Sequence, residues 1–191
     1  MNKTKRKIFE TSMKLFAEKG YEATSIEEIT SIVGVAKGTL YYHFSSKEEI
    51  FNFLVEEGMK LLKNSIEIKI EKKEKYIDKI KAIVLIQIKI LVKYEDFMTI
   101  LFSHIWGKEP RNNMCRDYLA EYIDTIEAIV KDGIESGELI ECNPEVVASA
   151  IFGLACSSLI YKQKSKKEID IMEISKEIEK SILNGLTKKR K

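Results

Sequence analysis

The sequence predicts an all-α protein of about nine helices, in which a three-helix head precedes a larger helical core. Ile, Leu, Lys and Glu are abundant among the 191 residues while Val and Thr are sparse, a mixture that favours helix. Only two prolines interrupt the chain, and glycines stand where the apolar periodicity stops. With 45% hydrophobic residues and a net charge of +2, the chain can fill a packed core, which excludes intrinsic disorder.

Apolar residues at helical spacing define the individual elements. The predicted helices span residues 3–19, 25–34, 36–44, 47–72, 76–94, 97–105, 111–135, 145–163 and 168–186. Gly20 ends the first helix. Ser25 with Glu28, and Ser46 with Glu49, have the spacing of capping boxes, in which each side chain accepts a free backbone N–H. These two pairs place the starts of the second and fourth helices.

The second half of the chain carries similar signals. Asp96 is expected to cap the helix over 97–105, and Gly137 to close the helix over 111–135. Asn143 as cap and Pro144 at the first helical position open the helix over 145–163. The stretch from Val146 to Tyr161 has sixteen residues without a charge, fewer than the about 20 that span a membrane. We expect a buried helix there and no membrane association.

Residues 25–44 have the pattern of a helix-turn-helix, in which the second helix enters the major groove of DNA. Gly34 can supply the positive backbone angle that the tight turn needs. In the helix over 36–44, only Leu40 and Phe44 are spaced as core residues. The remaining aromatic side chains are left exposed with polar tips, which suits contacts with phosphates and base edges.

The charge distribution agrees with a nucleic-acid contact, although the net charge does not. The first seven residues carry four cations, and residues 29–47 contain no acidic side chain. Lys37 and Lys47 are therefore expected to approach phosphates without a nearby carboxylate, helped by the free N–H groups at the start of the fourth helix.

The stretch from residue 8 to residue 51 resembles the DNA-binding domain of the TetR (tetracycline repressor) family of bacterial regulators. The residues that carry the resemblance are Leu15-Phe16, Gly20-Tyr21, Thr24-Ser25-Ile26, Ile29, Gly34-Val35, Gly38-Thr39-Leu40-Tyr41, Phe44 and Lys47-Glu48. Ser12 and Thr30 stand where the family usually has alanine. The resemblance implies a DNA-binding domain over 1–47 and an effector-binding and dimerisation domain over 48–191. It covers about the first quarter of the chain.

The same resemblance implies roles for individual residues of the head. Lys37, Gly38 and Thr39 match positions that read base edges or neighbouring phosphates. The positions that grip the DNA backbone are matched by Tyr41, Tyr42 and His43, and the helix-start phosphate contacts by Ser25 and Lys47. Lys5, Arg6 and Lys7 are expected to reach the adjacent backbone as a flexible arm.

The resemblance also implies a homodimer on a palindromic operator, with the interface on the last two helices. Ser149, Gly153 and Ser157 lie four residues apart and give the helix over 145–163 a smooth stripe of small residues, along which a second helix can pack closely. Phe152 belongs to the same helix, which is apolar nearly all round and must be buried on more than one side. The other predicted interface residues are Ile178 and Ile182.

The helices over 76–135 are expected to form a pocket for a hydrophobic or amphipathic small-molecule effector. Its candidate contacts are Gln87, His104, Trp106, Tyr118 and Tyr122. An effector that prefers a conformation with misplaced heads would weaken DNA binding by its differential affinity. The long helix over 47–72 would transmit the change. No cofactor and no metal is expected.

Other functional classes fit the sequence less well. The chain has no H-E-x-x-H, no G-x-S-x-G and no glycine-rich phosphate loop, so we do not expect an enzyme. Three cysteines without C-x-x-C spacing are typical of idle thiols in the reducing cytoplasm. The prediction is a dimeric, effector-responsive repressor, and the same fold acting as an activator or through a protein partner stays open.

Overall fold

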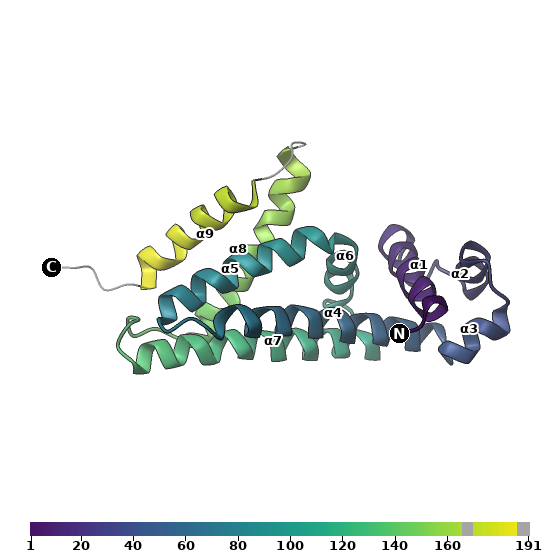
Figure 1. Ribbon diagram of the computed structural model, residues 1–191, viewed down its shortest axis with the longest axis horizontal. Coiled ribbons are helices and arrows are strands. Elements are labelled where there is room, and N and C mark those ends of the chain that lie inside the picture. Colours follow the sequence, from purple (N-terminus) through teal and green to yellow (C-terminus); the bar gives the residue numbers. More distant parts are fainter. Residues whose placement is uncertain (166–169, 187–191) are drawn as a thin grey trace. The chain divides into compact units, whose positions relative to one another are not determined.

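The computed structural model describes residues 1–165 and 170–186, and this part of the chain contains nine helices and no strand (Figure 1). The helices are α1 Lys3–Lys19, α2 Ile26–Val33, α3 Lys37–His43, α4 Lys47–Ile70, α5 Tyr76–Lys93, α6 Glu95–His104, α7 Pro110–Glu135, α8 Pro144–Ser165 and α9 Ile171–Leu186. The all-α prediction is confirmed, and most helix ends lie within two residues of their predicted positions. The predicted start of the last helix, at residue 168, lies outside the described residues.

The chain folds into two compact units. The head unit contains residues 1–59 and 95–117, and the core unit contains residues 60–94 and 118–191. The head unit therefore holds α1 to α3, α6 and the beginnings of α4 and α7. Within it α1 contacts α2, α3 and α6.

Aromatic rings fill the interior of the head unit. Phe16 and Phe51 are almost fully buried, with ring centroids 6.2 Å apart. Phe44 packs edge-on against Phe53 at 5.6 Å, which ties the end of α3 to α4. Lys5 lies over both of these rings, 4.8 Å and 4.5 Å from their centroids. The expected flexibility of residues 5–7 is wrong, because the chain is helical from Lys3 onward and Lys5 packs on the rings. A contact of these residues with the DNA backbone stays a prediction.

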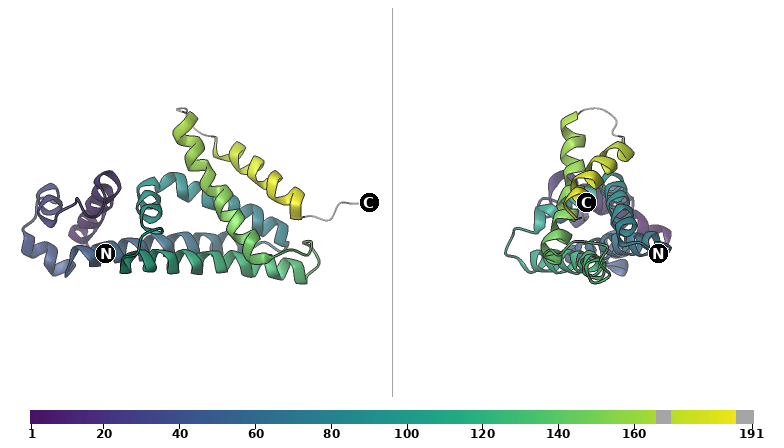
Figure 2. Two further views of the ribbon diagram at one scale, coloured as in Figure 1. Left: turned by 180° about the vertical axis from the view of Figure 1, so that it is seen from behind. Right: turned by 90° about the vertical axis from the view of Figure 1, so that its left-hand side faces the viewer.

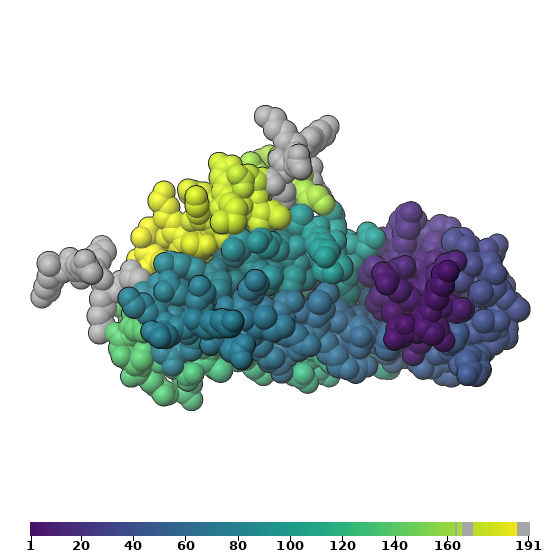
Figure 3. Space-filling model, in the orientation of Figure 1, coloured from purple at the N-terminus to yellow at the C-terminus, as the bar shows by residue number. Residues whose placement is uncertain are grey.

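In the core unit, α5 contacts both α8 and α9, and α8 also contacts α9 (Figure 2). The space-filling view shows α9, in yellow, lying over α5, in teal (Figure 3). The interior is aliphatic: α5 buries Ile83, Val84, Ile88 and Leu91 almost completely. Gln87 is the polar exception on this buried face.

The capping predictions are partly confirmed. Ser25 Oγ accepts from the Glu28 N–H at 3.1 Å, and Ser46 Oγ accepts from the Glu49 N–H at 3.0 Å. The second hydrogen bond of each capping box, from the serine N–H to the glutamate carboxylate, is not formed, because nearby groups compete for the two carboxylates. Glu28 pairs with Lys19, and Glu49 accepts from the backbone N–H of Ser45 at 2.6 Å.

The later helix ends give a similar mixture. Asn143 Oδ1 accepts from the Val146 N–H at 3.2 Å, and Gly137 has the positive φ of 76° that ends a helix. Both confirm their predictions. The predicted cap at Asp96 is wrong, because α6 begins one residue earlier, at Glu95, and Asp96 lies inside its first turn.

One described helix, over Pro144–Lys162, is long and apolar enough to cross a membrane. The buried core helix of a soluble protein passes the same test, so length and composition alone do not assign it. Ile151 and Ala155 on this helix are fully buried within the chain.

Candidate functional site

The turn between α2 and α3 has the geometry that the sequence predicts. Gly34 adopts a left-handed conformation with φ 75° and ψ 40°. The N–H groups of Gly34 and Val35 both donate to the carbonyl of Thr30, at 2.9 Å and 3.1 Å. This paired bond ends α2 tightly and lets α3 begin three residues later, at Lys37. The turn of the predicted helix-turn-helix is confirmed.

Helix α3 turns two residues inward and several outward. Leu40 is 0% exposed and Phe44, just after the helix, is 1% exposed, as predicted. Tyr42 is 84% exposed and Tyr41 is 44% exposed. The ring of His43 lies 5.1 Å from that of Tyr42, edge to face. His43 itself is half-buried, whereas the two tyrosines are exposed polar aromatics that suit contacts with a phosphate backbone.

The other two candidates on α3 lie at its start. Gly38 is exposed, and a methyl group built on it would meet nothing within 4 Å. Thr39 is half-buried, with its N–H bonded to the Ala36 carbonyl at 2.9 Å. The absence of a side chain at Gly38 leaves room for DNA to approach the backbone of α3 closely.

Lys37 does not lie free of carboxylates, contrary to the expectation from the acid-free stretch. Its ammonium pairs with Glu27 of α2 at 2.5 Å and lies 6.0 Å from the centre of the Tyr41 ring. The hydrogen bond from Lys37 holds the pKa of Glu27 below its usual range, so the carboxylate is charged at neutral pH. Both side chains are exposed, and water and salt screen such a pair, so DNA can displace Glu27 at little cost.

Lys47 is also engaged within the head unit. Its ammonium donates to the carbonyls of Tyr21 and Thr24, both at 2.8 Å, and lies 4.3 Å above the Tyr21 ring. These partners are carbonyls and an aromatic ring, so the lysine is engaged without pairing with a carboxylate. Ser25 uses its oxygen to cap α2, which leaves its hydroxyl proton available to a phosphate. A phosphate contact stays a prediction for both residues.

Two of the predicted effector contacts come together in the core unit. Gln87 Nε2 donates to the Tyr122 hydroxyl at 2.7 Å, and the two side chains are 0% and 1% exposed. The Gln87 Oε1 atom is buried and has no hydrogen-bond partner among the described residues. Burial raises the pKa of the Tyr122 hydroxyl, which keeps it protonated and able to donate. The Phe152 ring packs edge-on against Tyr122 at 5.6 Å.

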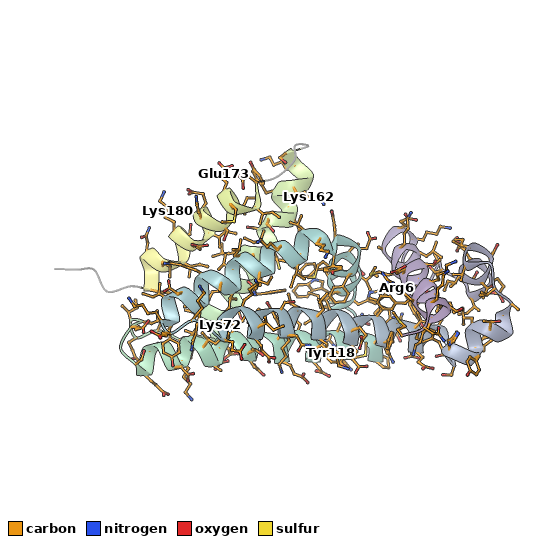
Figure 4. The ribbon with its side chains drawn as sticks, viewed as in Figure 1. Arg6, Lys72, Tyr118, Lys162, Glu173 and Lys180 are labelled. Atoms are coloured by element: carbon orange, nitrogen blue, oxygen red, sulfur yellow. The ribbon has the colours of Figure 1, made fainter. Side chains whose placement is uncertain are left out.

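Of the other predicted effector contacts, two lie away from this pair, and the third, Tyr118, lies one helical turn before Tyr122 on α7. His104 belongs to the head unit, where its ring lies 4.7 Å from that of Phe51. Trp106 is 86% exposed on the loop before α7. Tyr118 is half-buried on α7 (Figure 4). Among the described residues, no group of three or more His, Cys, Asp or Glu side chains is placed to hold a metal ion.

The predicted dimer residues divide into two sets. Ser149, Gly153 and Ser157 are exposed along one side of α8, and a methyl group built on Gly153 would meet nothing within 4 Å. The second set, which is Phe152, Ile178 and Ile182, is buried within the chain itself. Charged side chains such as Glu173 and Lys180 line the exposed part of α9 (Figure 4). Only the first set has the exposure that a contact with a second copy needs.

Some residues of the head were missed at the sequence level. Glu27 and Arg111 carry no local signal, because their partners, Lys37 and Tyr21, lie 10 and 90 positions away in the chain. Glu27 lies just before the acid-free stretch, and an i to i+10 pairing across a helix-turn-helix could have revealed it.

Comparisons with known proteins agree with this architecture. Residues 8–54 match the family described as bacterial regulatory proteins, tetR family, and residues 73–160 match the tetracyclin repressor-like C-terminal domain. The fatty acid metabolism regulator protein of Bacillus subtilis is 24% identical over 185 residues, which are 95% of each chain.

Solved structures extend the likeness to the whole fold. A putative fatty acid metabolism regulator of Clostridium perfringens has a TM-score of 0.88 and 35% identity, and the match covers 96% of this chain and 100% of that one. The structure of AibR in complex with isovaleryl coenzyme A and operator DNA has a TM-score of 0.78 and 21% identity, over 94% of this chain and 97% of that one. The chain therefore belongs to the TetR family of ligand-responsive, DNA-binding transcriptional regulators.

Proposed function

We propose that this regulator is a homodimeric repressor that leaves a palindromic operator when it binds an amphipathic molecule with an acyl chain. The proposal assigns operator contacts to residues 1–47 and effector binding and dimerisation to residues 48–191. Since its target is chromosomal DNA, we place it in the bacterial cytoplasm. The observation that carries the effector proposal is the buried pair of Gln87 and Tyr122.

The chemistry of this pair supports an effector with a short polar segment and a long apolar one. The buried residues around it on α5 are aliphatic, which suits a hydrocarbon chain. Gln87 Oε1 offers an acceptor and the Tyr122 hydroxyl offers a proton, so an amide group, which has both an N–H and a carbonyl, could satisfy both, and a thioester carbonyl could accept from the hydroxyl. The relatives named for fatty acid metabolism, and the neighbour bound to isovaleryl coenzyme A, support an acyl thioester or a fatty acid.

The dimer proposal rests on the exposed side of α8. The smooth stripe of Ser149, Gly153 and Ser157 leaves room for a second helix, and Ile160 nearby on the same helix is 70% exposed. We propose that the stripe meets its own counterpart, which also explains why so apolar a helix is only partly buried in one chain. Gly153→Arg, which the chain itself can accommodate, is expected to give a helical monomer with weak operator affinity.

The effector experiment begins with an operator that the purified dimer selects from random duplex DNA. Fluorescence anisotropy of the labelled operator is followed while long-chain acyl-coenzyme A, isovaleryl-coenzyme A, a free fatty acid or coenzyme A alone is added. We expect an acyl compound to release the DNA and coenzyme A alone to have no effect. The double variant Gln87→Leu/Tyr122→Phe should bind the operator normally and lose the response. Release by coenzyme A alone, or a normal response of the double variant, would contradict the proposal.

A further inference from the structure

Tyr21 lies between two cations in the turn that joins α1 to α2. Its side chain is 8% exposed. The Lys47 ammonium lies 4.3 Å from the centre of its ring, and the guanidinium carbon of Arg111 lies 4.5 Å from it. We call Tyr21, Lys47 and Arg111 the Tyr21 clamp. Cation–π attraction strengthens when the cation is shielded from water, and Arg111 is only 18% exposed.

The two cations reach the ring from different parts of the chain. Lys47 begins α4 and belongs to the same sequence segment as the helix-turn-helix. Arg111 lies in the first turn of α7, yet it belongs to the head unit. It also pairs with Glu22, the residue after Tyr21. A residue outside the helix-turn-helix segment therefore contacts two consecutive residues of the turn that precedes α2.

The segment that carries Arg111 is held firmly. Asn112 is 5% exposed, and its side chain accepts from the Glu109 N–H at 2.8 Å and donates to the His104 carbonyl. Arg116 donates to the carbonyls of Ile105 and Gly107 at 2.8 Å and 2.9 Å. These bonds fix the loop between α6 and α7, so the Arg111 backbone is a stiff support for its side chain.

Two further aromatic rings contact Tyr21. The His104 ring at the end of α6 lies 6.3 Å from Tyr21, and Phe51 of α4 lies 5.2 Å from it, both edge to face. The turn then continues into α2 through Thr24, whose hydroxyl donates to the Gly20 carbonyl at 2.9 Å and whose carbonyl accepts from Lys47. Movement of the ring would therefore move the first residue of the helix-turn-helix.

We propose that Arg111 is a positioning residue for operator binding, which acts through Tyr21. It holds the turn over residues 21–24, the turn sets where α2 begins, and α2 carries α3 through the tight turn at Gly34. Phosphate and base contacts need a fixed register on the duplex, so a small displacement of this turn weakens every contact of α3 together. The clamp also makes the first turn of α7 a part of the DNA-binding head.

The test measures operator affinity as a function of salt for Arg111→Met, Arg111→Lys and Tyr21→Leu. Arg111→Met should weaken binding by about tenfold, since a shielded cation–π contact is lost from each protomer. The slope of log affinity against log salt should not change, because no phosphate contact is lost. Arg111→Lys keeps the charge and should give a smaller loss of affinity. It provides the test if the methionine variant folds poorly. Lys131→Met, which removes an exposed cation of α7, is the matched control and should bind normally.

A double variant separates positioning from general destabilisation. Arg111→Met combined with Tyr21→Leu should bind no more weakly than Tyr21→Leu alone, because both changes break the same clamp. Tyr21→Phe keeps the ring and should bind as the unchanged protein does. The proposal is overturned if folded Arg111→Met binds normally, if its salt slope falls by about 0.9 per lost phosphate contact, or if the two changes act additively.

Discussion

Tyr122→Phe removes one hydroxyl from the interior of the core unit and should destabilise it measurably. The hydroxyl is the one hydrogen-bond partner of the Gln87 side chain among the described residues, at 2.7 Å, and both side chains are shielded from water. Without it, both polar ends of the Gln87 amide are buried and unpaired, because Oε1 already has no partner. An unsatisfied buried polar group costs about 1–3 kcal/mol, so the free energy of unfolding should fall by about that amount.

The double variant Gln87→Leu/Tyr122→Phe makes the physical argument sharper. Replacing both partners by apolar groups of similar shape leaves nothing unpaired, so its stability should return to within about 1 kcal/mol of the original. The single variant should therefore be less stable than the double variant. If packing alone decided stability, the double variant, which carries two changes, would be the less stable of the two.

Urea unfolding followed by circular dichroism, at one fixed protein concentration, measures both changes, because dimer stability depends on concentration. The slope of free energy against urea must stay constant for the comparison to hold. In thermal scans each kcal/mol corresponds to about 2–4 °C for a chain of this size. The reasoning fails if Tyr122→Phe is as stable as the unchanged protein, or if the double variant is less stable than the single one.

Four further predictions concern the head and the thiols. Tyr42→Ala should weaken binding to all DNA sequences several-fold without lowering the melting temperature, since the side chain is 84% exposed; unchanged affinity would remove its backbone role. Lys37→Ala should relax base preference, and it should also lower affinity because it leaves the Glu27 carboxylate unpaired beside the DNA. Adding Glu27→Ala should restore the affinity but not the base preference. If both are restored, Lys37 does not read a base. Gly34→Ala should lower the free energy of unfolding by about 1–2 kcal/mol, because alanine is strained at a φ of 75°. The added methyl group meets no atom within 4 Å, so a steric clash adds nothing to this cost. Burial raises the pKa of Cys115 to about 11 and that of Cys156 to about 12, so stability should fall as pH rises above about 9, where the unfolded thiols ionise first. Cys115→Ala should make that fall smaller, and a fall of unchanged size would contradict the contribution of this thiol.

The features that local sequence predicts are those whose causes are local. The tight turn after α2 depends on Gly34, and the inward side of α3 depends on the spacing of Leu40 and Phe44, so both are visible in a stretch of a few residues. The Ser25 and Asn143 caps follow from one side chain and the next turn. The sequence predicts Gln87 and Tyr122 only as two members of a broader set, because nothing local shows that two side chains 35 positions apart in the chain meet.

The failures have the opposite character, since each is caused by a partner distant in the chain. Glu28 fits a capping box, but Lys19 from the previous helix takes its carboxylate. His104 and Trp106 have the chemistry of pocket residues, yet one packs in the head unit and the other is exposed. Amphipathic side chains satisfy many environments, so composition alone does not tell a pocket from a surface loop.

The charges of the head show the same dependence on distant partners. Three lysines that the sequence offers to phosphate already have partners: Lys37 has Glu27, Lys47 has two carbonyls, and Lys5 has two aromatic rings. These partners differ in how readily they can be exchanged. DNA can replace an exposed carboxylate at Lys37, but drawing Lys47 away would release the turn that positions α2. A phosphate contact by Lys47 must therefore add to its bonds with that turn, whereas Lys37 is free to change partners and is the cation better suited to read a base.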